Sequence, residues 1–147
     1  MPDFPDFDPR TAEAASGHRD TTGLGGFLGI TTLDVGPGRM RCGLDVRPDL
    51  LNPFGMMHGG VVAALVDHIL GAVCYPVIPK GTWSATTEFK VNLVAPVREG
   101  TVEAAAEILS MSRRTAVVRI DVTNAGRVVA LAQGTVTLQP PKPPPPA

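Results

Sequence analysis

Residues 51–60, which read LNPFGMMHGG, hold the residue types best suited to chemistry in this chain. His58, Gly59 and Gly60 directly precede an apolar run that begins at Val61. If that run is a helix, the glycines let a ligand approach backbone N–H groups that have no intrahelical partner and lie at the positive end of the helix dipole. The segment therefore predicts an oxyanion hole for a carbonyl oxygen that becomes negative. The structural alternative is that the glycines only allow close helix–sheet packing and that His58 caps the helix.

Asp67 is the second candidate, because it interrupts the apolar run. An ionised carboxylate in an apolar helix costs several kcal/mol unless it is paired. Asp67 follows His58 by nine residues. At about 100° and 1.5 Å per residue, this places it on the opposite side of the helix and roughly 13 Å away, so the two cannot share a site within one chain. Two such helices, antiparallel about a two-fold axis, would bring Gly59 of one chain near Asp67 of the other. Alternatively, Asp67 is structural and bonds backbone or hydroxyl groups at a subunit seam.

The elements that must position these groups are mostly strands. One helix is predicted from His58 to about Tyr75, ended by Pro76. The turn at Gly36-Pro37-Gly38 and the period-two alternation after Thr115 are the strongest strand signals. The predicted strands cover residues 27–35, 39–46, 82–94, 101–111, 115–123 and 128–138.

This pattern predicts an α+β hot-dog-like fold, in which an antiparallel sheet wraps around one long central helix. The helix is apolar nearly all round, and such a helix has no face suited to water. One sheet cannot cover every side of it, so we expect a second copy to close the remainder in a homodimer or larger assembly.

A chain of 147 residues fits one core. We expect a flexible arm over residues 1–22, the folded domain over residues 23–139, and a disordered proline-rich tail over residues 140–147, with partner docking as the tail's alternative role. The formal net charge of −1 argues against nucleic acid or an anionic membrane as a partner. The absence of a basic, apolar start and the unpatterned Cys42 and Cys74 favour the cytoplasm.

Other chemistries lack their motifs. The chain has neither a Gly-x-Ser-x-Gly elbow nor a Walker loop, and the glycines of residues 23–29 miss the dinucleotide fingerprint. Its three histidines have no close second ligand, so we expect no metal site and no cofactor. His68 points away from Asp67 on a helix and is interpreted as structural, and His18 lies in the arm.

The motif Asn52-Pro53-x-Gly55-x-x-His58-Gly59-Gly60, with Asp67 following, resembles the hot-dog-fold acyl-CoA thioesterases, in particular the phenylacetate-pathway (PaaI-like) group. The resemblance extends to the strand of residues 86–93 with Pro96 and to the turn of residues 112–115, so it covers about residues 25–138.

The resemblance implies a role for each matching residue. Gly59 would donate to the oxyanion, and Asp67 would act as general base or nucleophile. Asn52 and His58 would position the thioester. Thr86 would match a hydroxyl residue that helps hold the water. Strict alternation places Thr86 on the face of Glu88 and Lys90, and a bulge or a register error of one would make Thr87 that residue instead.

The substrate would be an acyl- or aryl-CoA thioester, hydrolysed to free acid and CoA. Gly60, Phe54 and Met57 are further candidates for contact with the substrate, the latter two beside an apolar acyl slot along the helix. Arg113 and Arg114 would meet the CoA phosphates, although a solvated turn explains them equally well. Two rival functions remain: a hot-dog hydratase or dehydratase acting on enoyl or hydroxyacyl thioesters, and a non-catalytic acyl-thioester-binding protein.

Overall fold

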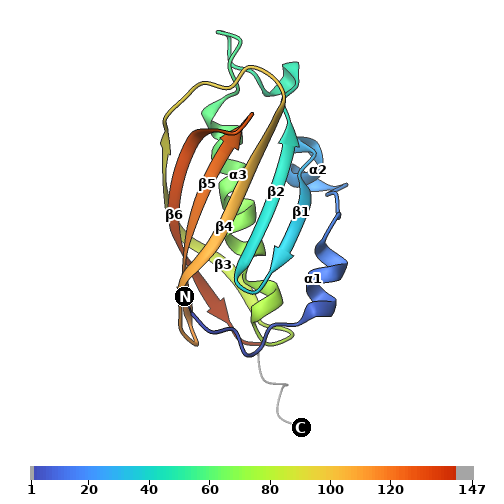
Figure 1. Cartoon of the computed structure of the whole chain (residues 1–147), viewed down its shortest axis with the longest axis vertical. Helices are drawn as coiled ribbons and strands as arrows, with labels where there is room; N and C mark the ends of the chain where they lie inside the picture. Colours follow the sequence, from blue (N-terminus) through green and yellow to red (C-terminus); the bar gives the residue numbers. More distant parts are fainter. Residues whose placement is uncertain (1, 142–147) are drawn as a thin grey trace.

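A six-stranded antiparallel sheet curls around one central helix (Figure 1). The computed structural model describes residues 2–141. The sheet order is β1-β2-β4-β5-β6-β3, and α3 (Gly59–Ala72) packs against the inner face of the sheet. The strands are β1 (Thr31–Gly36), β2 (Arg39–Asp45), β3 (Trp83–Leu93), β4 (Thr101–Met111), β5 (Thr115–Asn124) and β6 (Arg127–Gln139). The predicted hot-dog fold is confirmed.

The helix α3 buries only one side. Its buried residues recur at helical spacing and face the sheet: Val62, Leu65, Val66, Ile69 and Leu70. The opposite side, called here the α3 stripe, stays exposed or half-buried and consists of Gly60, Ala63, Ala64, Asp67 and Gly71. As predicted, one sheet does not cover every side of the helix, and the side that it leaves uncovered consists mainly of glycine and alanine.

The helix also ends earlier than predicted. It stops at Ala72, and a short 3-10 helix, η2 (Tyr75–Val77), follows. The stretch Gly59–Val77 is long and apolar enough to cross a membrane, but half of it is buried inside the protein. Its apolar composition thus serves the core of this fold.

The N-terminal region differs from the flexible arm that the sequence predicts. Residues Pro9–Ala15 form α1, which begins at Pro9 after the Asp8 cap, and Phe4 and Phe7 pack against the core. A seven-residue helix is marginal alone, so the packing of α1 against β1 and η2 stabilises it. The following residues add to the sheet: Gly17 N–H donates to the Thr32 carbonyl (2.8 Å), and Asp20 N–H to the Ile30 carbonyl (3.0 Å). We call residues 17–20 the edge cover of β1.

A second short helix replaces the start of the first predicted strand. α2 (Gly23–Leu28) ends at Gly29, whose φ of 72° suits glycine. The Arg47 guanidinium lies 4.9 Å from the centre of the Phe27 ring and donates to the Leu28 carbonyl (3.2 Å). A distant arginine therefore stabilises this helix, which local propensity does not favour. Of the predicted disordered tail, residues 142–147 lie outside the described residues.

Gly134 of β6 lets α3 and the neighbouring strand β3 approach β6 closely. A Cβ at this position would lie 2.7 Å from the Glu88 carbonyl oxygen and 2.8 Å from Leu70 Cδ2. Both contacts are too short for a real Cβ, so only glycine fits without a shift.

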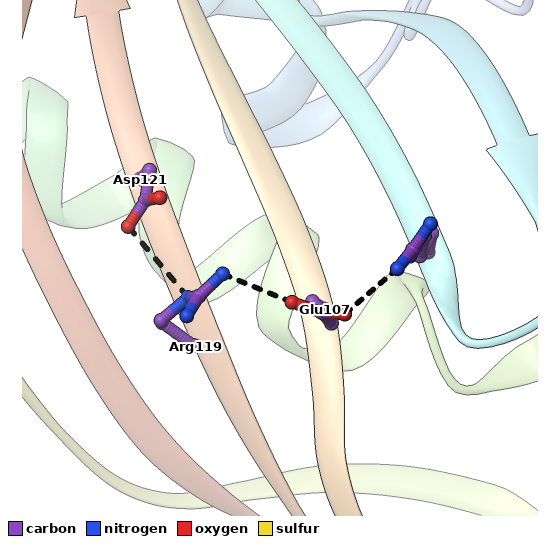
Figure 2. A network of polar contacts seen from close by, with 4 residues as sticks. Glu107, Arg119 and Asp121 are labelled. Carbon is purple, nitrogen blue, oxygen red and sulfur yellow. Dashed lines mark hydrogen bonds and ion pairs between the residues drawn. The ribbon is translucent and has the colours of Figure 1, made fainter. Parts of the chain in front are cut away.

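The outer face of the sheet is polar. Figure 2 shows Glu107 of β4 beside Arg119 of β5, which also approaches Asp121. The Glu107 carboxylate lies 2.9 Å from the Arg119 guanidinium and 3.0 Å from that of Arg39 on β2. Such exposed pairs stabilise little, and they lie on the face of the sheet that points away from α3.

Candidate active site

The start of α3 leaves one backbone donor free. His58 is the N-cap, and its Nδ1 accepts from the Gly60 N–H (2.9 Å), while the Val61 N–H donates to the His58 carbonyl (2.9 Å). Within residues 2–141, the Gly59 N–H has no hydrogen-bond acceptor. The helix cap that the structural alternative assigned to His58 is thus present, and this cap makes Gly59, not Gly60, the available donor. Because Nδ1 accepts, neutral His58 carries its proton on Nε2.

The loop before α3 is held by hydrogen bonds of its own. The Asn52 Oδ1 accepts from the N–H groups of Phe54 (2.9 Å) and Met56 (3.2 Å). The Met57 N–H donates to the Val97 carbonyl (2.7 Å). Asn52 therefore shapes the loop that presents Gly59, and only its amide NH₂ is left to meet a substrate.

Gly59 opens onto an apolar pocket of about 280 Å³. Met57, a predicted contact residue, lines it together with Asn52 and Val62. Phe54 does not line it and is 78% exposed in the single chain. Sequence reasoning missed the opposite wall, which consists of residues 93–97 and Val129. Pro96 directly after the apolar end of a strand was the one available signal for this wall.

Asp67 lies on the α3 stripe, away from Gly59. The two are eight residues apart on one helix, or about 12 Å along its axis, so one chain does not bring them together. Asp67 is exposed, and the cost expected for a buried carboxylate therefore does not arise in the single chain. The neighbouring His68 Nδ1 lies 3.7 Å from an Asp20 carboxylate oxygen, which gives it the structural role predicted for it.

A bulge in β3 settles which threonine faces the helix. The pairing of β3 with β6 shifts between Thr86 and Glu88, so Thr87 is the extra residue. Thr86 lies opposite the buried Val136 and therefore faces α3. Thr87 instead bonds the Thr137 hydroxyl (2.6 Å) on the outside. Strict alternation put Thr86 on the wrong face, because it did not include this bulge.

Arg113 and Arg114 lie at the opposite end of α3 from Gly59. They are in the turn between β4 and β5 and, with Lys80, line a cavity of about 1020 Å³ that also includes Val77 and Ile78 after the helix. Lys80 was missed because its sequence context resembles an ordinary loop. Within one chain, these cations do not meet the Gly59 pocket.

The arrangement presents two half-sites, separated along one helix. One is a free amide donor beside an apolar pocket, and the other is an exposed carboxylate near the β3 edge. The Ser84 Oγ of β3 donates to the Gly71 carbonyl (3.0 Å), one turn beyond Asp67. An amide donor that polarises a carbonyl and a carboxylate that activates water can together promote attack on that carbonyl. Here this requires a second protomer, whose carboxylate would lie near the amide of the first.

Comparisons with known proteins point to one reaction. The model of the thioesterase superfamily matches residues 54–131. Human acyl-coenzyme A thioesterase 13 is 27% identical over 111 residues, which cover 74% of this chain and 77% of the relative. A solved thioesterase of Haemophilus influenzae has a TM-score of 0.72 and 27% identity, covering 76% of this chain and 78% of its own. A mutant of the phenylacetic acid degradation protein PaaI of Thermus thermophilus has a TM-score of 0.69 and 33% identity, with 76% and 94% covered.

Proposed function

Because the chain belongs to the thioesterase superfamily and is a thioester hydrolase, we propose that it cleaves acyl- or aryl-CoA thioesters to free acid and CoA at a site that two protomers complete. The observation that carries this proposal is the free Gly59 N–H at the mouth of an apolar pocket. Coenzyme A is part of the substrate, and the reaction requires no cofactor.

The proposed mechanism uses two groups. The Gly59 N–H of one protomer donates to the thioester carbonyl oxygen, and the Asp67 carboxylate of its mate takes a proton from the attacking water. The oxyanion then collapses, the C–S bond breaks, and the sulfur leaves with its electron pair. Asp67 returns the proton to that sulfur, so the products are the acid and the CoA thiol. Thr86, which faces α3, would help hold the water.

Two features support a second copy of this chain as the missing half. Within residues 2–141, β3 has no strand on its outer side, although it is eleven residues long. The adjoining α3 stripe consists of small residues that let another helix approach closely around Asp67. A two-fold axis between two such surfaces would yield two identical sites in a homodimer, with a tetramer as a further step.

The same symmetry would give the distant arginines a role. In a pair of antiparallel α3 helices, the end of one protomer that carries Arg113 and Arg114 comes toward the Gly59 end of its mate. We propose that these guanidinium groups, with Lys80, bind the CoA phosphates while the acyl group enters the pocket at Gly59. Asn52 and His58 act through the loop and the helix cap that position Gly59.

The first experiment is Asp67→Asn, assayed by thiol release from a panel of acyl- and aryl-CoA thioesters. We expect kcat to fall by about 10²- to 10⁴-fold, as for loss of a general base, with assembly unchanged. Near-wild-type turnover on every thioester would remove Asp67 from the mechanism. Enoyl absorbance, followed in the same samples, tests the rival hydratase reaction.

A matched pair of variants isolates the Gly59 N–H. Proline at the first helical position lacks this N–H but fits a helix start, and the His58 ψ of 133° suits a residue before proline. We expect Gly59→Pro to lower kcat by about 10²- to 10³-fold. Gly59→Ala adds the same Cβ against Leu93 but keeps the N–H, so we expect it to retain most activity. Equal losses in both variants would show that crowding, and not the donor, matters.

Mixing the two defective chains tests the shared site directly. In a heterodimer of Gly59→Pro and Asp67→Asn chains, one of the two sites has both native groups. Random exchange should therefore restore about a quarter of wild-type activity. If each site lay within one chain, mixing would restore none.

A further inference from the structure

The pocket beside Gly59 has an unusually uniform lining. Its volume is about 280 Å³, and none of the eleven residues that line it carries a charged side chain. Asn52 has the single polar side chain among them, and its Oδ1 is already committed to Phe54 and Met56. A polar substituent on a bound acyl group would thus meet hardly any side-chain partner from the protomer that forms the pocket.

The backbone of the walls is committed as well. The N–H groups of Val94 (2.9 Å) and Ala95 (3.2 Å) both donate to the Val129 carbonyl, and that of Met57 donates to Val97. The first two bonds hold one wall together, and the third joins it to the wall that precedes α3. The Gly59 N–H remains free, and the proposed mechanism assigns it to the thioester carbonyl.

From this lining we infer that the acyl group of the substrate is small, neutral and apolar, with no carboxylate, ammonium or hydroxyl group of its own. The inference rests on the proposed function, because it takes the Gly59 N–H as the point where the carbonyl binds. A buried polar group without a partner is strongly disfavoured, and a buried charge more so. Since a water occupies about 30 Å³ in the liquid, the pocket accommodates an acyl group of about six to nine non-hydrogen atoms.

Leu93 is the specificity-determining residue at the mouth of this pocket. It is 56% exposed, and its Cδ1 lies 2.6 Å from the position that a Cβ on Gly59 would take. Its side chain therefore borders both the free donor and the pocket, where an acyl group would contact it. A lysine in its place would bring an ammonium group to the mouth and reduce the penalty on an acidic acyl group.

The experiment compares three thioesters of equal chain length: hexanoyl-CoA, 6-hydroxyhexanoyl-CoA and adipoyl-CoA. Relative to hexanoyl-CoA, we expect kcat/KM to fall about tenfold for the hydroxyl and about a hundredfold for the carboxylate. Leu93→Lys should narrow the hexanoyl-to-adipoyl ratio by about tenfold, which corresponds to one interaction with the carboxylate. Leu109→Lys is the matched control, because Leu109 is also exposed (41%) but lies on β4 away from the pocket. Equal hydrolysis of adipoyl-CoA and hexanoyl-CoA by the wild-type chain would overturn the inference.

A binding measurement separates this inference from the proposed function. Dissociation constants of the same three thioesters are measured by calorimetry on the Asp67→Asn chain, which is expected to bind the thioesters without hydrolysing them. Tighter binding of hexanoyl-CoA without thiol release from the wild type would support the pocket assignment and defeat the hydrolysis proposal. Thiol release with no preference in either kcat/KM or binding would support the hydrolysis proposal and defeat the pocket assignment.

Discussion

The two edges of the sheet are finished in opposite ways. At β1, the edge cover of residues 17–20 supplies hydrogen bonds to Ile30 and Thr32, so the chain itself covers the start of this edge, called here the closed edge. Strand β3 is eleven residues long, and in the described part of the chain no strand pairs with its outer edge. Exposed edges promote association with other chains, and proteins usually block them. In residues 2–141, the start of one edge is covered and the other edge, called here the open edge, has no strand beside it.

The open edge is the one beside the candidate catalytic groups. Leu93 at the end of β3 contacts Gly59, and Ser84 at its start bonds to Gly71, one turn from Asp67. The closed edge lies on the other side of α3, where Asp20 of the edge cover approaches His68. The asymmetry fits the proposed two-protomer site, which requires an accessible surface beside β3 and none at β1.

The largest effect should come from blocking the open side. Ala63 is a half-buried residue of the α3 stripe and is not part of the core cluster, so Ala63→Lys should leave the fold intact. The long cation would prevent a second α3 from approaching. We expect a monomer by analytical ultracentrifugation and a kcat/KM lower by about a thousandfold, since each site loses half of its groups.

The matched control for this variant lies on the outer face of the sheet. Ala105→Lys makes the same change at an exposed position of β4, between Arg41 and Asp121 on the neighbouring strands. This variant should assemble and turn over like the wild type. A monomeric Ala105→Lys, or an active monomer of Ala63→Lys, would contradict the assignment of the open edge.

The fold could be predicted where local pattern and tertiary context agree. The bounds of β4 match the prediction, and β5 differs by one residue, because alternating residues leave only one way to bury a face. The first predicted strand failed at its start, because Arg47, some twenty residues along the chain, stabilises a glycine-rich helix there. Helix α1 was not predicted, because its stability comes from packing that lies outside the local sequence.

A similar division holds for the candidate site. The residue types at His58 and Gly59 offered a free donor and, as the alternative, a helix cap, and the structure has both. The spacing to Asp67 predicted a separation that one chain cannot bridge, because helix geometry gives it. The side on which Thr86 lies could not be predicted, since it depends on a bulge that the pairing with β6 creates. The pocket wall after β3 could not be predicted either, because it forms only when distant segments meet.

The closed edge should be needed for stability. Removing residues 1–20 takes away the edge cover together with Phe4 and Phe7, which pack on the core. We expect the free energy of unfolding, measured by urea denaturation, to fall by about 3 kcal/mol. The loss of buried apolar surface is partly offset, because the truncated chain no longer has to order these residues. Removing only residues 1–16 keeps the edge cover. Concentration-dependent aggregation should appear in the longer truncation and not in the shorter one, and identical behaviour of the two would show that residues 17–20 do not protect β1.

At the open edge, the packing of β3 on β6 should be less costly to disturb. Gly134→Ala places a Cβ against the Glu88 carbonyl and Leu70, and backbone cannot move as easily as a side-chain tip. We expect a loss of about 2 kcal/mol in the free energy of unfolding, measured by urea denaturation. Gly126→Ala, at a turn glycine with open space around it but a φ of 75°, separates strain in the backbone from crowding. A Gly134→Ala chain of wild-type stability would show that β3 is loosely held against the sheet.

The smallest effect should follow from Asp20→Asn, which removes the charge between His18 (3.6 Å) and His68 (3.7 Å). Partly exposed pairs at such distances contribute little, so the edge cover should lose less than about 0.5 kcal/mol of local stability and remain paired through its backbone.

Thiol labelling followed by peptide mapping measures this local stability. Cys42 lies under the closed edge and Cys74 after α3, and burial raises the pKa of each thiol to about 11, so at pH 8 either reacts only when the structure opens. We expect the Cys42 rate to rise by less than about threefold and the Cys74 rate to stay unchanged. The Asp20 carboxylate also contributes to the raised pKa of Cys42. A tenfold rise at Cys42 beyond the effect of removing this charge would mean that the ion pairs, and not the backbone hydrogen bonds, keep β1 closed.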